Sequence, residues 1–109
     1  MIDNFLHFNK GRVLGLLLIL MAAPLSSVSA ADVFHGKEIY MRYCAGCHGS
    51  SGGGLMPGMP DFAQGERLLR TDQDLVDSVR LGNGVMPAFN GMLTDEEIEN
   101  VVAYLRSFL

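Results

Sequence analysis

The chain of 109 residues has few side chains that can carry chemistry, with only two cysteines and three histidines. A structural zinc site needs four ligands. Outside one short motif there is no further cysteine, and the only other histidines are His7 and His35, so a zinc site is disfavoured. The sequence also lacks an internal repeat, an alternating strand pattern and a glycine-rich phosphate loop. These absences leave a chain composed mainly of helices and irregular segments.

A long hydrophobic run is also lacking. The apolar stretch at 13–23 has eleven residues, whereas a membrane-spanning helix needs about 20. Lys10 and Arg12 precede this stretch, and small residues follow it at Val28-Ser29-Ala30, in the positions that a signal peptidase recognises. This order of features is typical of a secretory signal.

We therefore predict that residues 1–30 are a cleaved signal peptide and that 31–109 form a single domain. Cleavage is expected after Ala30 or Ala31. Export would place the domain in the periplasm. An uncleaved N-terminal anchor is the less favoured alternative, because the apolar run is short.

Positive charge is scarce in the predicted domain. Residues 31–109 contain six Lys or Arg and eleven Asp or Glu, which gives a net charge of −5. This sign disfavours a nucleic-acid partner, because binding to phosphates rests on cationic side chains. It favours protein partners that carry a basic docking patch. A domain of this size commonly needs a cross-link or a prosthetic group, in addition to its hydrophobic core, to be stable.

Both cysteines lie in one motif, Cys44-Ala45-Gly46-Cys47-His48. The C-x-x-C-H pattern is typical of covalent haem attachment, in which the two thiols bond to the porphyrin and the histidine binds the iron. A structural disulfide and a thioredoxin-like dithiol are the other interpretations. Neither explains the histidine, and the dithiol would be expected beside a βαβ pattern. We therefore predict one haem c, attached through Cys44 and Cys47, with His48 as an iron ligand.

Three segments have the signals of helices. The first runs over about 33–44 after the candidate cap Asp32, and the second runs from the cap Thr71 to about Leu81. The last helix begins at the capping box formed by Thr94 and Glu97. Its polar side chains are expected on the exposed face: Glu96, Glu99, Asn100 and Arg106.

Two segments between these helices predict irregular structure. The first, 49–59, is rich in glycine, and Pro57 and Pro60 at its end offer carbonyls that could accept from the second ring nitrogen of His48. The second, 82–91, presents Met86 just before a proline. A loop methionine is often filler. With a haem in the chain, Met86 becomes the favoured second iron ligand over the other methionines of the domain, which are Met41, Met56, Met59 and Met92.

Taken together, these features resemble the monohaem class I cytochromes c of bacteria over nearly all of 34–108. The resemblance implies a compact all-α fold of about three to four helices around one haem, in which the N- and C-terminal helices cross where Gly36 and Tyr40 meet Tyr104. The residues that carry it are Gly36-x-x-x-Tyr40-x-x-x-Cys44, the motif at 44–48, Pro60-Asp61-Phe62, Met86-Pro87 and Val102-Ala103-Tyr104-Leu105.

The resemblance also implies His48 and Met86 as the axial iron ligands. It implies that the Pro60 carbonyl accepts from His48, with Pro57 as the alternative. Pro60-Asp61-Phe62 stands where the family usually has a proline, an asparagine or aspartate, and an aliphatic residue. Met86 lies only 38 positions after His48, which is short for this family and predicts an exposed haem edge.

The sequence therefore predicts an exported one-electron carrier rather than an enzyme. Ligation by histidine and methionine leaves no open iron position and raises the reduction potential. The expected partners are redox proteins met through small transient contacts, and the expected state is a monomer. The alternatives are a haem protein with an open distal site for gas binding or redox catalysis, a thiol oxidoreductase without haem, and a dedicated electron-transfer subunit of a respiratory reductase or oxidase. The open distal site is disfavoured because the sequence offers no convincing acid or base for it. His35 precedes the motif and is expected at the start of the first helix.

Overall fold

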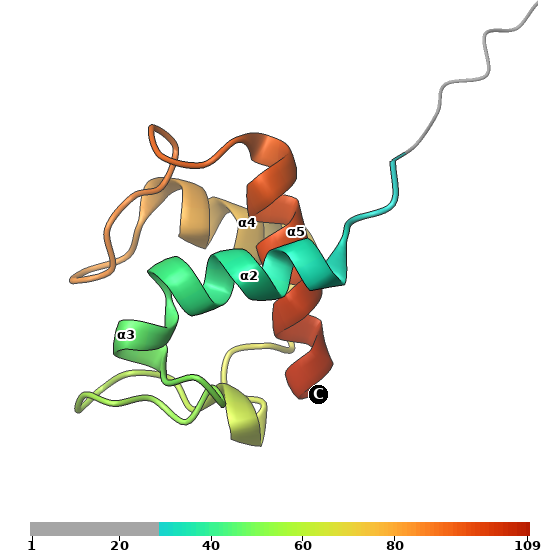
Figure 1. Ribbon diagram of the computed structural model, residues 1–109. Helices are drawn as coiled ribbons and strands as arrows, with labels where there is room; N and C mark the ends of the chain where they lie inside the picture. The colour runs from blue at the N-terminus through green and yellow to red at the C-terminus, as the bar shows by residue number, and fades with distance from the viewer. Residues whose placement is uncertain (1–28) are drawn as a thin grey trace, which may run out of the picture.

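The computed structural model describes residues 29–109, which form helices joined by irregular segments (Figure 1). Over this range no strand is formed, and the only β-type pairing is an isolated bridge between Asn83 and Met86. The predicted all-α class is therefore confirmed. The predicted signal peptide lies outside the described residues except for its last two positions. The elements are α2 (Val33–Tyr43), α3 (Ala45–His48), η1 (Phe62–Gln64), α4 (Asp72–Leu81), α5 (Asp95–Leu105) and η2 (Arg106–Phe108).

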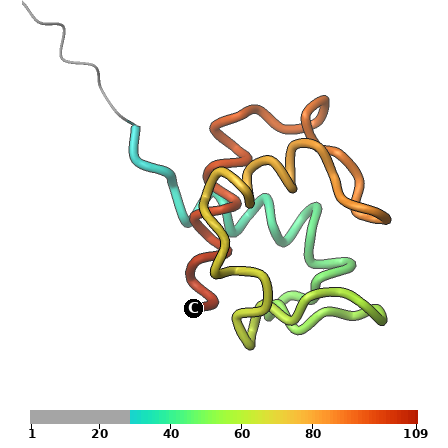
Figure 2. Tube along the Cα trace, turned by 180° about the vertical axis from the view of Figure 1, so that it is seen from behind, coloured from blue at the N-terminus to red at the C-terminus, as the bar shows by residue number. Residues whose placement is uncertain are grey.

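Helices α2 and α5 cross closely at the centre of the fold (Figures 1 and 2). The crossing depends on Gly36, because a Cβ at this position would overlap the backbone carbonyl of Asn100. One turn further along α2, the ring of Tyr40 is fully buried and lies 5.2 Å from that of Tyr104. The predicted crossing of the N- and C-terminal helices is confirmed.

The caps that begin these helices are those the sequence indicated. The Asp32 carboxylate accepts hydrogen bonds from the N–H groups of Phe34 and His35, at 2.9 and 3.1 Å. At the start of α5, the Thr94 hydroxyl and the Glu97 carboxylate form the reciprocal capping box. Such caps satisfy N–H groups that have no partner inside the helix.

Asn100 does not lie on the exposed face of α5, as its polarity had predicted. It is 2% exposed. Its side-chain oxygen accepts a hydrogen bond of 2.6 Å from the N–H of Asp32, the residue that caps α2. The amide is buried because the close crossing of the two helices brings it against a backbone donor that needs a partner.

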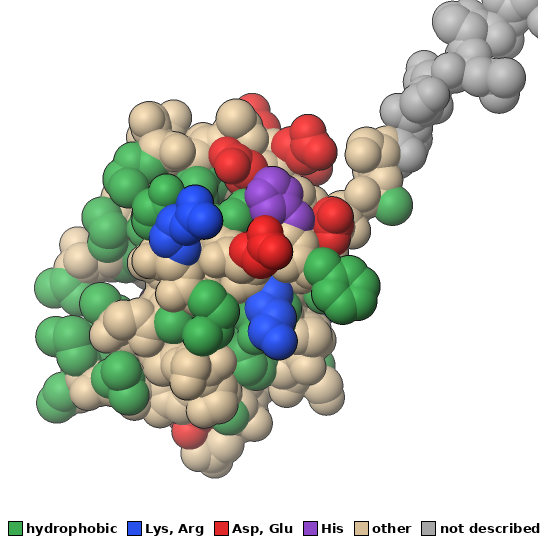
Figure 3. All heavy atoms as spheres, in the orientation of Figure 1, with side chains coloured by type: hydrophobic (Ala, Val, Ile, Leu, Met, Phe, Trp, Pro, Cys, Tyr) green, Lys and Arg blue, Asp and Glu red, His purple; other side chains and the backbone are tan. Residues whose placement is uncertain are grey.

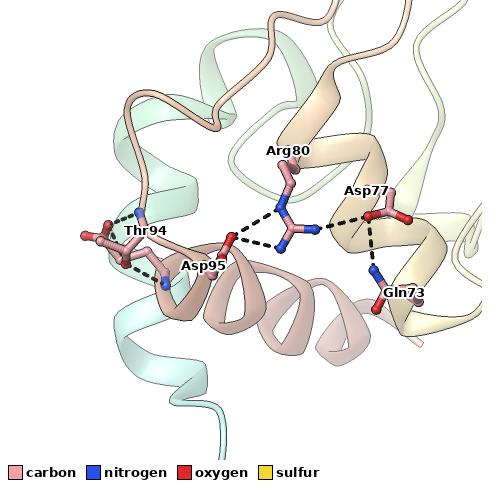
Figure 4. Close-up of polar contacts among 6 residues, drawn as sticks. Gln73, Asp77, Arg80, Thr94 and Asp95 are labelled. Atoms are coloured by element: carbon pink, nitrogen blue, oxygen red, sulfur yellow. Dashed lines mark hydrogen bonds and ion pairs between the residues drawn. The ribbon is translucent and has the colours of Figure 1, made fainter.

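Helix α4 packs beside α5, and an ion-pair cluster on the surface joins them (Figure 4). Arg80 of α4 donates to Asp95 of α5 at 2.8 Å and to Asp77 of its own helix at 3.2 Å. Asp77 in turn accepts from Gln73 at 3.0 Å. No helix among residues 29–109 is long and apolar enough to cross a membrane.

A residue distant in the chain holds the segment between η1 and α4. Arg106, just after α5, donates to the backbone carbonyls of Leu68 and Arg70. It also pairs with the Asp72 carboxylate at 2.5 Å. The C-terminal helix therefore fixes the backbone of a segment more than 30 residues earlier in the chain.

Candidate haem-binding site

A cavity of about 370 Å³ lies between the corner that joins α2 to α3, the segment that leads into η1, helix α4 and the loop that follows α4. Its wall is mainly apolar and contains four of the five site residues that the sequence predicted: Cys44, His48, Pro60 and Met86. The fifth, Cys47, is exposed and does not line it. The size falls within the roughly 300–1,000 Å³ typical of sites for small molecules and cofactors.

The corner between α2 and α3 places the first cysteine and the histidine on the same side. Helix α2 ends at Tyr43, and the N–H groups of Cys47 and His48 both donate to the Cys44 carbonyl, at 3.1 and 2.9 Å. This makes a single helical turn, which Gly49 ends with φ +80°. Residues four apart share a helix face, so Cys44 and His48 face the cavity. The two thiols are free, so the structure holds no disulfide between them.

The His48 imidazole is buried and has an unpartnered nitrogen. His48 is 8% exposed, and within the described part of the chain its Nδ1 has no hydrogen-bond partner. Burial lowers the pKa of this imidazole below its usual value, because a cation is poorly solvated there. The neutral form, which binds metals, is therefore favoured.

The two prolines predicted as acceptors lie on the wall that contains this imidazole. Pro57 and Pro60 line the same cavity as His48, but the hydrogen bond predicted from the second ring nitrogen is not formed, since Nδ1 is unpartnered. The face of the ring instead packs on Phe62, at a centroid distance of 4.7 Å.

A tight turn presents Met86 to the cavity. Gly82 ends α4 with φ +75°, and a Cβ there would lie 2.6 Å from the Met86 carbonyl oxygen. Asn83 and Met86 exchange backbone hydrogen bonds of 3.1 and 3.0 Å. The far end of the loop is tied to α4, where the Phe89 N–H donates to the Val79 carbonyl at 3.1 Å. The backbone around Met86 is therefore fixed on both sides.

Several residues of the wall were not predicted from the sequence, and three of them carry polar groups of interest. Arg67 and Arg70 are the charged residues that line the cavity, and Arg70 also donates to Ser78 at 3.1 Å. The Tyr40 hydroxyl donates to the Gly49 carbonyl at 2.7 Å, which anchors the backbone just after His48. Burial, with a smaller contribution from Cys44, raises the pKa of Tyr40 to about 12. The four-residue spacing of Tyr40 and Cys44 on one helix was the only sequence feature that indicated Tyr40 for this site. No sequence pattern indicated the two arginines.

The residues of this cavity fit a haem. The Cys44 thiol, an imidazole with an unpartnered buried nitrogen, and a thioether meet at a mainly apolar wall, and the exposed Cys47 thiol belongs to the same turn as Cys44. Imidazole and thioether are the axial ligands of cytochrome c iron. Zinc does not fit, because among residues 29–109 no group of three or more His, Cys, Asp or Glu side chains could hold a metal ion.

Known proteins are similar to this chain in sequence and in fold. The family described as "Cytochrome C oxidase, cbb3-type, subunit III" matches residues 31–105. Cytochrome c6 of Gracilaria tenuistipitata var. liui is 35% identical over 78 residues, covering 70% of this chain and 72% of the relative. Cytochrome c6 of Synechococcus sp. (strain ATCC 27167 / PCC 6312) is 34% identical over 98 residues, covering 85% of this chain and 86% of the relative.

Two solved structures are similar as well. Cytochrome c6 of the diatom Phaeodactylum tricornutum has a TM-score of 0.58 at 33% identity, covering 70% of this chain and 92% of that one. The KustC0563 c-type cytochrome has a TM-score of 0.62 at 28% identity, covering 67% and 95%.

The fold, the attachment motif and these relatives define one class of protein, the c-type cytochromes, whose haem is held covalently. Within that class, the chain belongs to the monohaem class I cytochromes c. Its cofactor is one covalently bound haem c, and it works as an electron carrier.

Proposed function

We propose that this chain is an exported one-electron carrier whose haem iron is held between His48 and Met86. The observation that carries the proposal is that Cys44 and His48, from one turn, and Met86, from a loop far along the chain, line one mainly apolar cavity. Cys44 and Cys47 are the thioether attachment points. Pro60, on the same cavity wall, is the proposed acceptor for the second ring nitrogen of His48 once the haem is bound.

The protein positions both proposed iron ligands, His48 and Met86, at the cavity. The lowered pKa of His48 keeps its imidazole neutral near pH 7, so that a nitrogen lone pair is free to bind a metal. The Gly82 turn holds Met86 on the cavity wall. The bound haem supplies an iron that gains or loses one electron. The apolar wall excludes water from the ligands, and burial of this kind is one of the levers that tune the potential.

Electron transfer is proposed to occur where apolar side chains surround the cavity. In Figure 3 hydrophobic side chains gather over α3 and the nearby loops, whereas acidic ones gather near the other end of α2. Leu55, Met56 and Val85, on the two irregular segments, are all more than half exposed. Such a surface suits a small transient contact with a redox protein. The acidic balance of 31–109 supports a partner with a basic patch.

The proposed location is the periplasm, reached by a signal peptide at 1–30 that is removed after Ala30 or Ala31. The proposed state is a monomer. Sequencing the N-terminus of the protein recovered from a periplasmic fraction tests the cleavage. A first residue before Ala31 would contradict it.

The ligation is tested by the absorption spectrum of the haem-loaded protein, oxidised and reduced, with and without Met86→Ala. A low-spin spectrum with a weak near-infrared sulfur-to-iron band, lost in Met86→Ala, is the expected result. Met92→Ala is the matched control, because Met92 is 60% exposed and does not line the cavity. A high-spin spectrum in the unmutated protein that carbon monoxide shifts readily would mean an open iron and contradict the proposal.

A second candidate function is a dedicated electron-transfer subunit of a respiratory enzyme. It is favoured by the match of 31–105 to the family described as subunit III of the cbb3-type cytochrome c oxidase. The two functions differ in the native state of the protein. A single copy that is released with the periplasmic fraction supports the free carrier, whereas stable co-migration with a membrane-bound oxidase supports the subunit.

A further inference from the structure

Two arginines lie at the mouth of the haem cavity, on the segment between η1 and α4. Arg67 and Arg70 both line the cavity and are both exposed to solvent, so they stand where its wall meets the surface. The attachment and ligand residues Cys44 and His48 belong to another part of the wall, the corner of α2 and α3. A guanidinium presents a planar fork of donors that matches a carboxylate.

A second cavity residue holds the Arg70 side chain at the wall. Its Nη1 donates to the Ser78 hydroxyl at 3.1 Å, and Ser78 also lines the cavity. The Ser78 hydroxyl in turn donates to the Asp74 carbonyl of α4 at 2.8 Å. The Asp74 carboxylate lies 4.0 Å from the Arg70 guanidinium, with side-chain exposures of 51% and 43%. Exposed ion pairs of this kind are weak, so Arg70 keeps donors for a second carboxylate at the cavity mouth.

Arg67 has an unusual backbone conformation. Its φ of +62° makes it the one non-glycine residue among residues 29–109 in the left-handed region, where the Cβ crowds the following carbonyl. Such conformations persist only where the surrounding structure imposes them, and they cluster at functional sites. The next residue, Leu68, is fully buried. At this turn the chain therefore passes from the cavity mouth directly into the core.

Arg106 fixes this segment from the side of the C-terminal helix. Its guanidinium donates to the carbonyls of Leu68 and Arg70, the latter at 2.7 Å, and pairs with Asp72. Arg106 does not itself line the cavity. One carbonyl that it holds belongs to Arg70 and the other to the residue that follows Arg67. A single side chain outside the cavity therefore sets the backbone from which both arginines extend.

We infer that Arg67 and Arg70 bind the propionates of the haem and that Arg106 is the residue that positions them. The inference rests on the haem c cofactor and on its proposed attachment at Cys44 and Cys47. Haem c carries two propionate carboxylates, anionic at neutral pH, on the edge opposite its two thioether bonds. A guanidinium beside a propionate offsets negative charge that stabilises the oxidised iron. The placement of the two arginines therefore raises the reduction potential.

The test is a redox titration of the haem-loaded full chain, followed by its absorption spectrum, in Arg67→Gln, Arg70→Gln and Arg106→Lys. Each variant is expected to have a lower reduction potential than the unmutated protein. Lysine keeps the charge of Arg106 but not the planar fork that reaches two carbonyls, so a lower potential there reports positioning and not lost charge. Arg80→Lys is the matched control, because Arg80 pairs with two surface carboxylates and does not line the cavity. Its potential should be unchanged.

A combined variant separates positioning from a direct effect of Arg106. Arg106→Lys is added to the chain that carries both Arg67→Gln and Arg70→Gln. The shift caused by Arg106→Lys should vanish in that background, because the groups that Arg106 positions are gone. Unchanged potentials in Arg67→Gln and Arg70→Gln would overturn the inference. A shift from Arg106→Lys that persists in the combined variant would overturn the role of Arg106.

If Arg106→Lys does not assemble with haem, Asp72→Asn provides the second test of positioning. It removes the carboxylate that pairs with the Arg106 guanidinium. Loss of a negative charge alone would raise the potential and count against positioning, whereas displaced arginines would lower it. The absorption spectrum recorded in the same titration reports ligation by His48 and Met86, so a failure of this inference is distinguishable from a failure of the proposed function.

Discussion

The α-carbon of Gly36 in α2 lies directly against the backbone carbonyl of Asn100 in α5. A Cβ at Gly36 would overlap this carbonyl oxygen and lie 3.1 Å from the N–H of Val101. The obstacle is backbone on the opposite helix, so no side-chain rotation can relieve it. This contact sets how closely the two helices approach, and hence where α3 stands relative to the C-terminal helix.

Gly36→Ala is therefore expected to destabilise the domain by about 3 kcal/mol, the upper end of the usual cost of overpacking. Alanine is intrinsically better in a helix by about 1 kcal/mol, which the overlap outweighs. Denaturant unfolding of the haem-loaded protein measures the change. Gly46→Ala is the matched control, because a Cβ at Gly46 meets nothing within 4 Å. Equal stability of the two variants would show that the helices are not in close contact.

Gly82→Ala is expected to disturb the Met86 turn. Gly82 has φ +75°, and its Cβ would lie 2.6 Å from the Met86 carbonyl oxygen. The expected result is a weakened or lost sulfur-to-iron band in the oxidised spectrum. Gly84→Ala separates the clash from simple backbone strain, since Gly84 also has a positive φ of +60° but meets nothing within 4 Å. A band that survives in Gly82→Ala would mean that the turn does not hold Met86.

Tyr40→Phe is expected to lower the free energy of unfolding by about 1–3 kcal/mol, because the Gly49 carbonyl loses its buried donor. Tyr43→Phe is the control, since Tyr43 is 40% exposed. Urea unfolding of the two variants gives the comparison. Similar small losses would show that the hydroxyl of Tyr40 contributes no more than an exposed one.

The same tyrosine predicts a pH dependence in alkali. The pKa of Tyr40 is raised from 10.0 to about 12, chiefly by burial, so the folded state holds this proton more tightly than the unfolded chain. The contribution to stability is complete below pH 10 and is lost as the pH rises from 10 toward 12. Stability measured across this window should fall less in Tyr40→Phe than in the unmutated protein. Parallel curves would exclude Tyr40 as the source.

Arg106→Gln is expected to cost about 2–3 kcal/mol, since Arg106 donates to the Leu68 and Arg70 carbonyls and hydrogen bonds to charged groups are the stronger ones. Arg80→Gln is the comparison. Its partners Asp77 and Asp95 are exposed carboxylates, and such surface pairs contribute about 1 kcal/mol or less. Thermal unfolding distinguishes the two variants. A loss in Arg106→Gln no larger than that in Arg80→Gln would mean that the segment before α4 does not depend on Arg106.

Local signals predicted the helices well. Asp32, Thr71 and Thr94 cap the elements they were expected to cap, because an N-cap is an interaction between residues two or three apart. The segment before α4 had no such local signal. Its conformation depends on Arg106, which lies far along the chain, and no pattern within the segment could reveal it.

The candidate site was predicted in its chemistry but not in its surroundings. The spacing of Cys44, Cys47 and His48 and the loop position of Met86 were enough to nominate these residues, and Cys44, His48 and Met86 line the same cavity. The burial of Asn100 was missed, because polarity along α5 indicates exposure unless another helix supplies a donor. The contact of His48 with Phe62 was missed for the same kind of reason.

By itself, the sequence determined what depends on neighbouring residues: the helix caps, the attachment motif and the presence of a methionine in a tight loop. Only the tertiary structure decided what depends on residues distant in the chain. Three contacts belong to this second group: the close packing of Gly36 against Asn100, the hydrogen bonds of Arg106 to the segment before α4, and the stacking of Phe62 on His48. The physical reason is that each joins groups brought together by packing, and sequence periodicity reports which face is buried but not what it meets there.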